Sequence, residues 1–483
     1  MASWVPSWFR FPQPTTARHL LYGVLIGLSL SVTSTSLVLY TQKRKRDRQE
    51  LSYDKRPIEI RSDEIVDGVT GLIGNTPLVR INSLSDALGV EILGKAEYLN
   101  PGGSVKDRVA LRIIEDAERQ GLIHPHTGSR IFEGTVGSTG ISIATIAKAR
   151  GYDVTIIMPD DVAAEKVKAL ESLGADVERV RPASIVDKKQ FVNLAKDRAA
   201  HFGHTKDPHD SLIRSTSSVL VTTTASEAVL HEHGTLTLEE AEELKMKPRG
   251  FFADQFENRS NFQAHFEGTG PEIWRQTSGR VDAFVSGAGT GGTLSGTGQY
   301  LKSVKEDLLI ALSDPEGSGL YNKIKHGVMY DRREAEGTKR RHQVDTVVEG
   351  IGINRLTINM ELGLDIIDDA FRITDAEAVA MSRYLVEHDG LFLGSSSACN
   401  LVACVKFVKK MGWGGGGQRV VTILCVYALL VLERGDEADL FGLAGVDVIL
   451  GRGIILSSGK NDEYLHRAGI PIDLQIIEDL LAS

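Results

Sequence analysis

The segment Leu99-Asn-Pro-Gly-Gly-Ser-Val-Lys-Asp-Arg108 sets a lysine at the start of a predicted helix. Pro101 and the two glycines after it end any preceding strand in a tight turn, and apolar residues then recur at helical spacing. Ser104 can cap this helix, so Lys106 lies in its first turn. A cation gains nothing from the helix dipole at that end, which favours anions. Lys106 is therefore a candidate for covalent chemistry through an amine of lowered pKa, and a solvated surface lysine is the alternative.

A glycine-rich turn joins a second predicted strand and helix. Val281-Asp-Ala-Phe-Val285 has the pattern of a short buried strand, and Ser286-Gly-Ala-Gly-Thr-Gly-Gly-Thr-Leu-Ser-Gly296 follows it directly. Backbone N–H groups in such a turn point at a bound anion, and glycines let the anion approach. The turn lacks the Lys-Ser/Thr of a Walker loop and the spacing of a dinucleotide turn, and a flexible loop is the alternative. Together with Lys106, a phosphate-binding turn predicts pyridoxal 5'-phosphate as the cofactor.

Further motifs lie on both sides of these two segments. They are Thr70–Val79, Glu133–Gly140, Asp254–Asn258, Gly268–Trp274, Glu349–Gly352 and Gly394–Ala398. In this order the motifs resemble the cysteine synthase / cystathionine β-synthase family of fold type II pyridoxal-phosphate enzymes, and within it the membrane-anchored fungal cysteine synthases. The resemblance implies an α/β fold with two three-layer α/β domains, the cofactor in the cleft between them, and an N-terminal transmembrane helix.

The resemblance also implies roles for the cofactor-binding residues. Lys106 is implied as the lysine that bonds the cofactor and as the base that moves the substrate α-proton. Ser396 is implied to face the pyridine nitrogen, where a neutral partner suits β-elimination better than transamination. Ser138 stands where the family usually has the asparagine that contacts the cofactor's phenolic oxygen. The phosphate cradle is implied to be Gly289, Thr290, Gly291, Gly292 and Thr293.

The substrate carboxylate is implied to bind at the turn before another predicted helix. Val136 stands there in place of the family's usual serine, so the substrate preference is open. The turn residues concerned are Thr135, Val136, Gly137 and Thr139. The activity implied is synthesis of L-cysteine and acetate from O-acetyl-L-serine and sulfide, by a homodimer. Cystathionine β-synthase-like activity, serine or threonine deamination, and an inactive membrane-tethered homologue remain as alternatives.

The chain of 483 residues is long enough for two α/β domains, and its charge is unevenly placed. Residues 1–50 hold seven Lys or Arg and two acidic residues, although the whole chain has a net charge of −9. Residues 20–40 carry no charge, and at about 1.5 Å per residue they can span a bilayer core of about 30 Å. The basic run Lys43-Arg-Lys-Arg46 favours a cytosolic side. We expect an anchor in the mitochondrial outer membrane. A cleaved transit or signal peptide, with the enzyme in the matrix or cytoplasm, is the alternative.

The catalytic core is expected over residues 62–425, with an exposed insertion at 204–249. Residues 426–456 form an apolar stretch where the family has an Asp-Ser-Gly turn, and they are interpreted as an atypical insert or a gene-model artefact. Residues 457–483 are expected to form the core's C-terminal tail.

Disulfide bonds, metal ions and nucleic acid are not expected. The three cysteines form no Cys-x-x-Cys pair, which argues against disulfides and zinc. His231-Glu-His233 is interpreted as a solvated face, so no metal site is predicted. The core has no basic patch for nucleic acid.

Overall fold

The computed structural model describes residues 65–162, 164–183, 187–202, 214–216, 219–223, 247–331, 346–425, 466, 469–471 and 473–482. The expected N-terminal anchor and the 426–456 insert lie outside these residues, as does most of the 204–249 insertion. Within the described ranges, no helix has both the length and the apolar character needed to cross a membrane.

Sheet A is six-stranded and carries the predicted strand before the glycine-rich turn. Its first edge strand pairs antiparallel with its neighbour, and the other pairings are parallel. In spatial order the strands are β1 (Leu78–Arg80), β2 (Glu91–Ala96), β12 (Arg419–Leu424), β9 (Ala283–Gly287), β10 (Leu309–Pro315) and β11 (Asp369–Ile373).

Sheet B is also six-stranded, with a parallel half and an antiparallel half. The strands are β5 (Asp176–Val180), β4 (Asp153–Pro159), β3 (Arg130–Gly134), β8 (Arg249–Phe252), β7 (Val219–Thr223) and β6 (Arg214–Thr216). Strands β6 and β7 fall inside the insertion expected at 204–249. This part of the segment extends the sheet through antiparallel pairing with β8.

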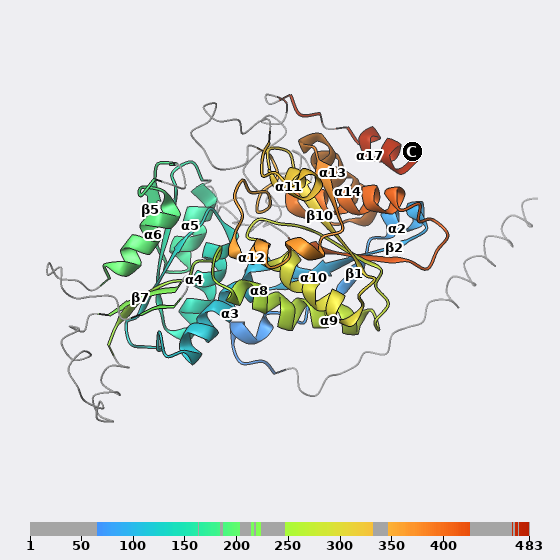
Figure 1. Ribbon diagram of the computed structural model, residues 1–483. Helices are drawn as coiled ribbons and strands as arrows, with labels where there is room; N and C mark the ends of the chain where they lie inside the picture. Colours follow the sequence, from blue (N-terminus) through green and yellow to red (C-terminus); the bar gives the residue numbers. More distant parts are fainter. Residues whose placement is uncertain are drawn as a thin grey trace, which may run out of the picture. The chain divides into compact units, whose positions relative to one another are not determined.

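Helices cover both faces of sheet A because its strands are apolar on both sides. In β9, Ala283 and Val285 belong to one buried cluster, and Phe284 between them belongs to another. The first cluster includes residues of α13 (Asp375–Asp389) and α14 (Ser395–Lys410), and the second includes α9 (Gly270–Gln276) and α10 (Gly292–Val304). Figure 1 shows these two helix pairs on opposite sides of the sheet. Sheet A is thus the middle of three layers.

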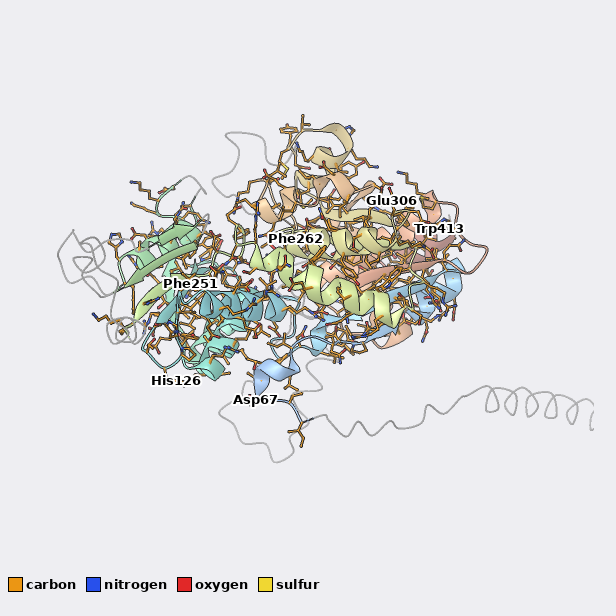
Figure 2. All side chains as sticks on the ribbon, turned by 60° about the horizontal axis from the view of Figure 1, so that its bottom comes forward. Asp67, His126, Phe251, Phe262, Glu306 and Trp413 are labelled. Atoms are coloured by element: carbon orange, nitrogen blue, oxygen red, sulfur yellow. The ribbon has the colours of Figure 1, made fainter. Side chains whose placement is uncertain are left out.

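Sheet B has the same layering. Ile131 of β3 packs with residues of α3 (Lys106–Arg119), α4 (Ser138–Arg150) and α5 (Ala164–Ser172), and the adjacent Phe132 packs with α6 (Phe191–Ala200). Phe251 of β8, labelled in Figure 2, lies in the first of these clusters. The fold is α/β, as expected, and both sheets are mixed. The remaining elements are η1 (Val69–Leu72), α2 (Asn82–Leu88), η2 (Glu97–Leu99), α8 (Ser260–Ala264), η4 (His265–Thr269), α11 (Leu320–His326), α12 (Ile358–Glu361), η6 (Leu364–Ile366) and α17 (Gln475–Ala482).

A buried ion network fixes the beginning of α3. The Nε and Nη2 atoms of Arg108 donate to the two carboxylate oxygens of Glu97 at 2.7 and 2.8 Å. Arg108 Nη1 and Nη2 donate to Glu272 of α9 at 2.7 and 2.8 Å. Lys95 of β2 completes the network, with its Nζ 2.6 Å from Glu272 Oε2. The Arg108 network (Lys95, Glu97, Arg108, Glu272) therefore joins α3 to β2 and α9.

The network also fixes the turn that leads into α3. Asn100 donates from Nδ2 to Glu97 Oε2 at 2.8 Å and accepts the Gly74 N–H at the same distance. Burial would raise the pKa of Glu272, but Arg108 and Lys95 outweigh it and lower that pKa to about 2. The ionised carboxylate is thus the form that the folded state stabilises.

We predict that Glu272→Gln lowers the free energy of unfolding at pH 7 by about 3 kcal/mol, because it leaves two buried cations without their shared partner. The folded pKa lies below the usual 4.5, so this contribution is present above pH 4.5 and is lost as pH falls toward 2. Chemical denaturation of wild type and variant between pH 7 and pH 3 measures the difference.

Asp86→Asn is the matched control, since Asp86 forms an exposed pair with Arg80 at 2.6 Å. It should change the free energy of unfolding by about 0.5 kcal/mol or less. Equal losses in the two variants would contradict the structural importance given to the Arg108 network.

Candidate active site

A cavity lies between the start of α3, the turn after β9 and the start of α14. Its wall combines residues that are far apart in the chain. They are Ser104–Lys106, Ser138, Ser286–Gly291, Thr293, Glu349–Ile351, Ser396, Asn400, Ile423 and Cys425. Lys106 and the glycine-rich turn, the two segments that the sequence singles out, therefore share one cavity.

Four of the described helices begin at this cavity. Lys106 and Ser138 are the first residues of α3 and α4, Gly291 is the N-cap of α10, and Ser396 is the second residue of α14. The first N–H groups of a helix have no partner within the helix, and its dipole places partial positive charge at that end. The cavity is therefore built to hold an anionic ligand.

Lys106 begins α3 as the sequence predicts, although the cap differs in detail. Val105 is the N-cap, and the Ser104 hydroxyl accepts the Lys106 backbone N–H at 3.2 Å. Burial lowers the pKa of the Lys106 amine, and the nearby Cys425 opposes that shift. A lowered pKa favours the neutral amine, which is the form that can attack an aldehyde or take a proton.

At two positions of the glycine-rich turn, a side chain would clash with neighbouring backbone. Gly291 has φ +87°, and a Cβ there would come 2.6 Å from the Cα of Met360. A Cβ on Gly289 would come 2.6 Å from the carbonyl oxygen of Gly350. Thr290 and Thr293 are among the residues that line the cavity, whereas Gly292 packs against Asn261. The turn thus offers hydroxyl and backbone donors at the start of α10.

Asn400 is a cavity residue that the sequence analysis missed. Its Oδ1 accepts the Gly287 N–H at 2.8 Å, and its Nδ2 donates to the Ile423 carbonyl at 3.1 Å. It therefore joins β9 to β12, and both of its partners, Gly287 and Ile423, line the cavity. A polar residue within the apolar run of α14 was the available signal.

The predicted substrate loop lies beside the cavity. Ser138 reaches the wall, but Thr135, Val136, Gly137 and Thr139 are not part of it. Thr139 donates from its hydroxyl to Gln255 Oε1 at 2.6 Å, and the Gly137 N–H donates to Thr135 Oγ1 at 3.3 Å. Val136 is 37% exposed. The loop is thus held at the start of α4.

Glu133, at the end of β3, is a second residue that the sequence analysis did not single out as functional. Its side chain is buried, and burial raises its pKa well above the usual value, with Asp254 adding to the rise. Amide groups of Asp254 and Gln255 oppose the shift without cancelling it. Burial in the folded state therefore shifts the Glu133 carboxyl toward its neutral form.

These residues fit pyridoxal phosphate. Threonine hydroxyls and helix N–H groups suit a phosphate, and a desolvated lysine in the same cavity suits an aldehyde. Across the described ranges, no group of three or more His, Cys, Asp or Glu could hold a metal ion.

Comparison with known proteins agrees with this chemistry. Residues 69–426 match the family model described as "Pyridoxal-phosphate dependent enzyme". The chain is 52% identical over 363 residues to "Cysteine synthase 2" of Schizosaccharomyces pombe, covering 75% of this chain and 82% of that protein. It is 52% identical to "Cysteine synthase 2" of Emericella nidulans, covering 78% and 81%. It is 46% identical to "Putative mitochondrial cysteine synthase" of Saccharomyces cerevisiae, covering 74% and 81%.

We predict that Glu133→Gln becomes more stable relative to wild type as pH rises. The folded pKa of Glu133 is raised, so its stabilising contribution is complete below the usual 4.5 and is lost as pH rises through the folded pKa. The free energy of unfolding of wild type should fall relative to the variant by up to about 1.4 kcal/mol per pH unit in that range. Denaturation at several pH values from 5 to 8 measures this slope.

The exposed Glu306, labelled in Figure 2, provides the control substitution Glu306→Gln. Its stability should follow wild type across the same pH range. A flat difference between Glu133→Gln and wild type would show that the Glu133 carboxyl ionises normally in the folded protein.

Proposed function

This chain belongs to the family of pyridoxal-phosphate dependent enzymes, and we propose that it makes L-cysteine and acetate from O-acetyl-L-serine and sulfide. The observation that carries the proposal is that Lys106 shares its cavity with the threonine-bearing turn at the start of α10. The names of the fungal relatives support the choice of reaction.

Pyridoxal phosphate, when bound, withdraws electrons from the substrate α-carbon and so makes the α-proton acidic. Lys106 would hold the cofactor covalently. Thr290, Thr293 and the first N–H groups of α10 would bind the phosphate. Ser396, at the start of α14, would give the ring nitrogen a neutral hydroxyl partner, and Ser138 would contact the phenolic oxygen.

Lys106 would also move the proton. The substrate amine would first displace Lys106 from the cofactor. The freed neutral amine would then take the proton from the substrate α-carbon, and acetate would leave with the electron pair of its bond to the β-carbon. Hydrosulfide then forms the new bond at the β-carbon, and Lys106 returns a proton to the α-carbon. Desolvation of Lys106 favours this cycle, because the same amine must be neutral when it accepts the proton.

The turn that contains Thr135, Val136, Gly137 and Thr139 would bind the substrate carboxylate. It leads into α4, whose N-terminal end favours an anion. Val136 offers no hydroxyl there, so recognition would rest on the backbone N–H groups and on Thr135 and Thr139.

We predict that Lys106→Ala abolishes covalent retention of the cofactor and lowers the rate of cysteine formation by about a thousandfold or more. After borohydride reduction, mass spectrometry of the wild-type chain should show the added mass of the cofactor, and the variant should show none. Product analysis with O-acetylserine and sulfide measures the rate. Assays for cystathionine, pyruvate and 2-oxobutanoate test the alternative reactions.

Lys302→Ala is the control, because Lys302 forms a peripheral pair with Asp368 at 2.9 Å. It should keep both the added mass and the activity. Covalent retention in Lys106→Ala would rule out the assignment of Lys106, whereas a cofactor-loaded wild type that forms only pyruvate or cystathionine would rule out the cysteine synthase reaction alone.

We also propose that residues 20–40 anchor a homodimer in the mitochondrial outer membrane, with the catalytic part facing the cytosol. The uncharged span with its basic flank supports the anchor, and the name of the Saccharomyces cerevisiae relative supports the organelle. Residues 426–456 would be foreign to the catalytic fold, and the family match, which ends at residue 426, supports this interpretation.

Deletion of residues 1–48 should release an enzyme that leaves the membrane fraction and keeps its activity, because every proposed site residue follows Thr70. Fractionation of cells that express the full and shortened chains, followed by cysteine synthase assays, tests this. A shortened chain that stays with membranes would show that the attachment lies elsewhere.

A further inference from the structure

Two buried side chains behind the cavity contact the threonines of the glycine-rich turn. Asn261 lies on α8, and His265 follows four residues later at the start of the π-helical turn η4. Asn261 Nδ2 lies 2.9 Å from Thr290 Oγ1, and His265 Nε2 lies 3.1 Å from Thr293 Oγ1. Figure 2 marks the helix by Phe262, the residue after Asn261. One helical segment therefore reaches both cavity hydroxyls from behind.

The contact of Asn261 has a defined direction. Its Nδ2 also lies 2.8 Å from the Gln255 carbonyl oxygen, which can only accept. The amide nitrogen must therefore face both partners, and it donates one proton to each. Thr290 Oγ1 accepts from Asn261, so its own proton remains for another acceptor. Among the described residues, that hydroxyl has no acceptor, and Thr290 is one of the residues that line the cavity.

The hydrogen bond between His265 and Thr293 also has a defined donor and acceptor. Burial holds its pKa well below the usual value, so the ring is neutral and carries a single N–H. Its Nδ1 lies 2.9 Å from the buried Thr269 hydroxyl, which makes no other hydrogen bond in the described part of the chain. If Nδ1 carried the proton, the Thr269 proton would be left buried without an acceptor.

The other tautomer satisfies both ring nitrogens and the Thr269 hydroxyl. Thr269 donates to Nδ1, Nε2–H donates to Thr293 Oγ1, and the Thr293 proton is left for another acceptor. A π-helical turn at this position is consistent with a functional role, since such turns are frequent at functional sites.

We propose that Asn261 and His265 are positioning residues that hold the hydroxyl protons of Thr290 and Thr293 toward the cofactor phosphate. The inference rests on the proposed placement of that phosphate in the glycine-rich turn. The two threonine hydroxyls could otherwise rotate their protons away from the phosphate, and they are instead held as donors before the phosphate binds. The gain is specific to the phosphate, because the rest of the cofactor makes no use of these protons.

The test compares pyridoxal phosphate with pyridoxal, which lacks the phosphate, by absorbance titration of the apoenzyme. His265→Leu and Asn261→Asp should each raise the Kd for pyridoxal phosphate about tenfold or more. Each should change the Kd for pyridoxal by about twofold or less. His265→Gln, which keeps an N–H donor, should recover most of the affinity. Thr277→Val, in a buried threonine that bonds to the Ile273 carbonyl, is the control and should leave both constants unchanged.

Equal weakening of both ligands in His265→Leu and Asn261→Asp would overturn the proposal, because it would indicate general damage to the fold. Unchanged affinity for pyridoxal phosphate in these variants would overturn it as well. If Thr290→Val and Thr293→Val also bind pyridoxal phosphate as wild type does, the proposed placement of the phosphate fails instead.

A second measurement needs no variant. In the wild-type holoenzyme labelled with ¹⁵N-histidine, NMR should show His265 neutral with its proton on Nε2. A proton on Nδ1 would overturn the role given to His265, whatever the affinities of the variants.

Discussion

The convergence of four helix N-termini on one cavity is the constraint on which the rest of the site depends. The starts of α3, α4, α10 and α14 bring unpaired N–H groups and partial positive charge to the same place. An anionic ligand is favoured there, and a protonated lysine is disfavoured. Burial in the same cavity lowers the pKa of Lys106. The cavity thus combines an environment that suits a phosphate with one that favours a neutral lysine amine.

The four helix N-termini must be held in place at the cavity. The Arg108 network holds the start of α3. Glu97 is fully buried, and Arg108 offsets its charge by donating to both carboxylate oxygens, to which Thr76 and Asn100 also donate. The two carboxylates of the network are matched by two cations, Arg108 and Lys95. The charges of the network therefore balance. Burial shifts Glu133 and His265 toward their neutral forms, so these two side chains bring little charge of their own.

The sequence predicts the parts of the site that depend on neighbours in the chain. The turn before Lys106 and the glycine-rich turn are both contiguous, and each carries its own strand, turn and helix signals. Both lie at one cavity in the structure. The α/β layering follows in the same way from apolar strands that alternate with helices. Strand β7 was not predicted, because its reason to form is the antiparallel partner β8, about thirty residues later in the chain.

The residues that sequence reasoning missed share a different property: each is a buried polar group whose partner lies elsewhere in the chain. Asn400 bonds to Gly287, and Asn261 bonds to Thr290. Periodicity can mark such a residue as an anomaly in an apolar segment, but it cannot identify the group that satisfies it. These pairings decide which way the hydrogen-bonding groups of the site point. A threonine hydroxyl can rotate its proton toward the ligand or away from it, and the donor behind the hydroxyl decides which of the two occurs.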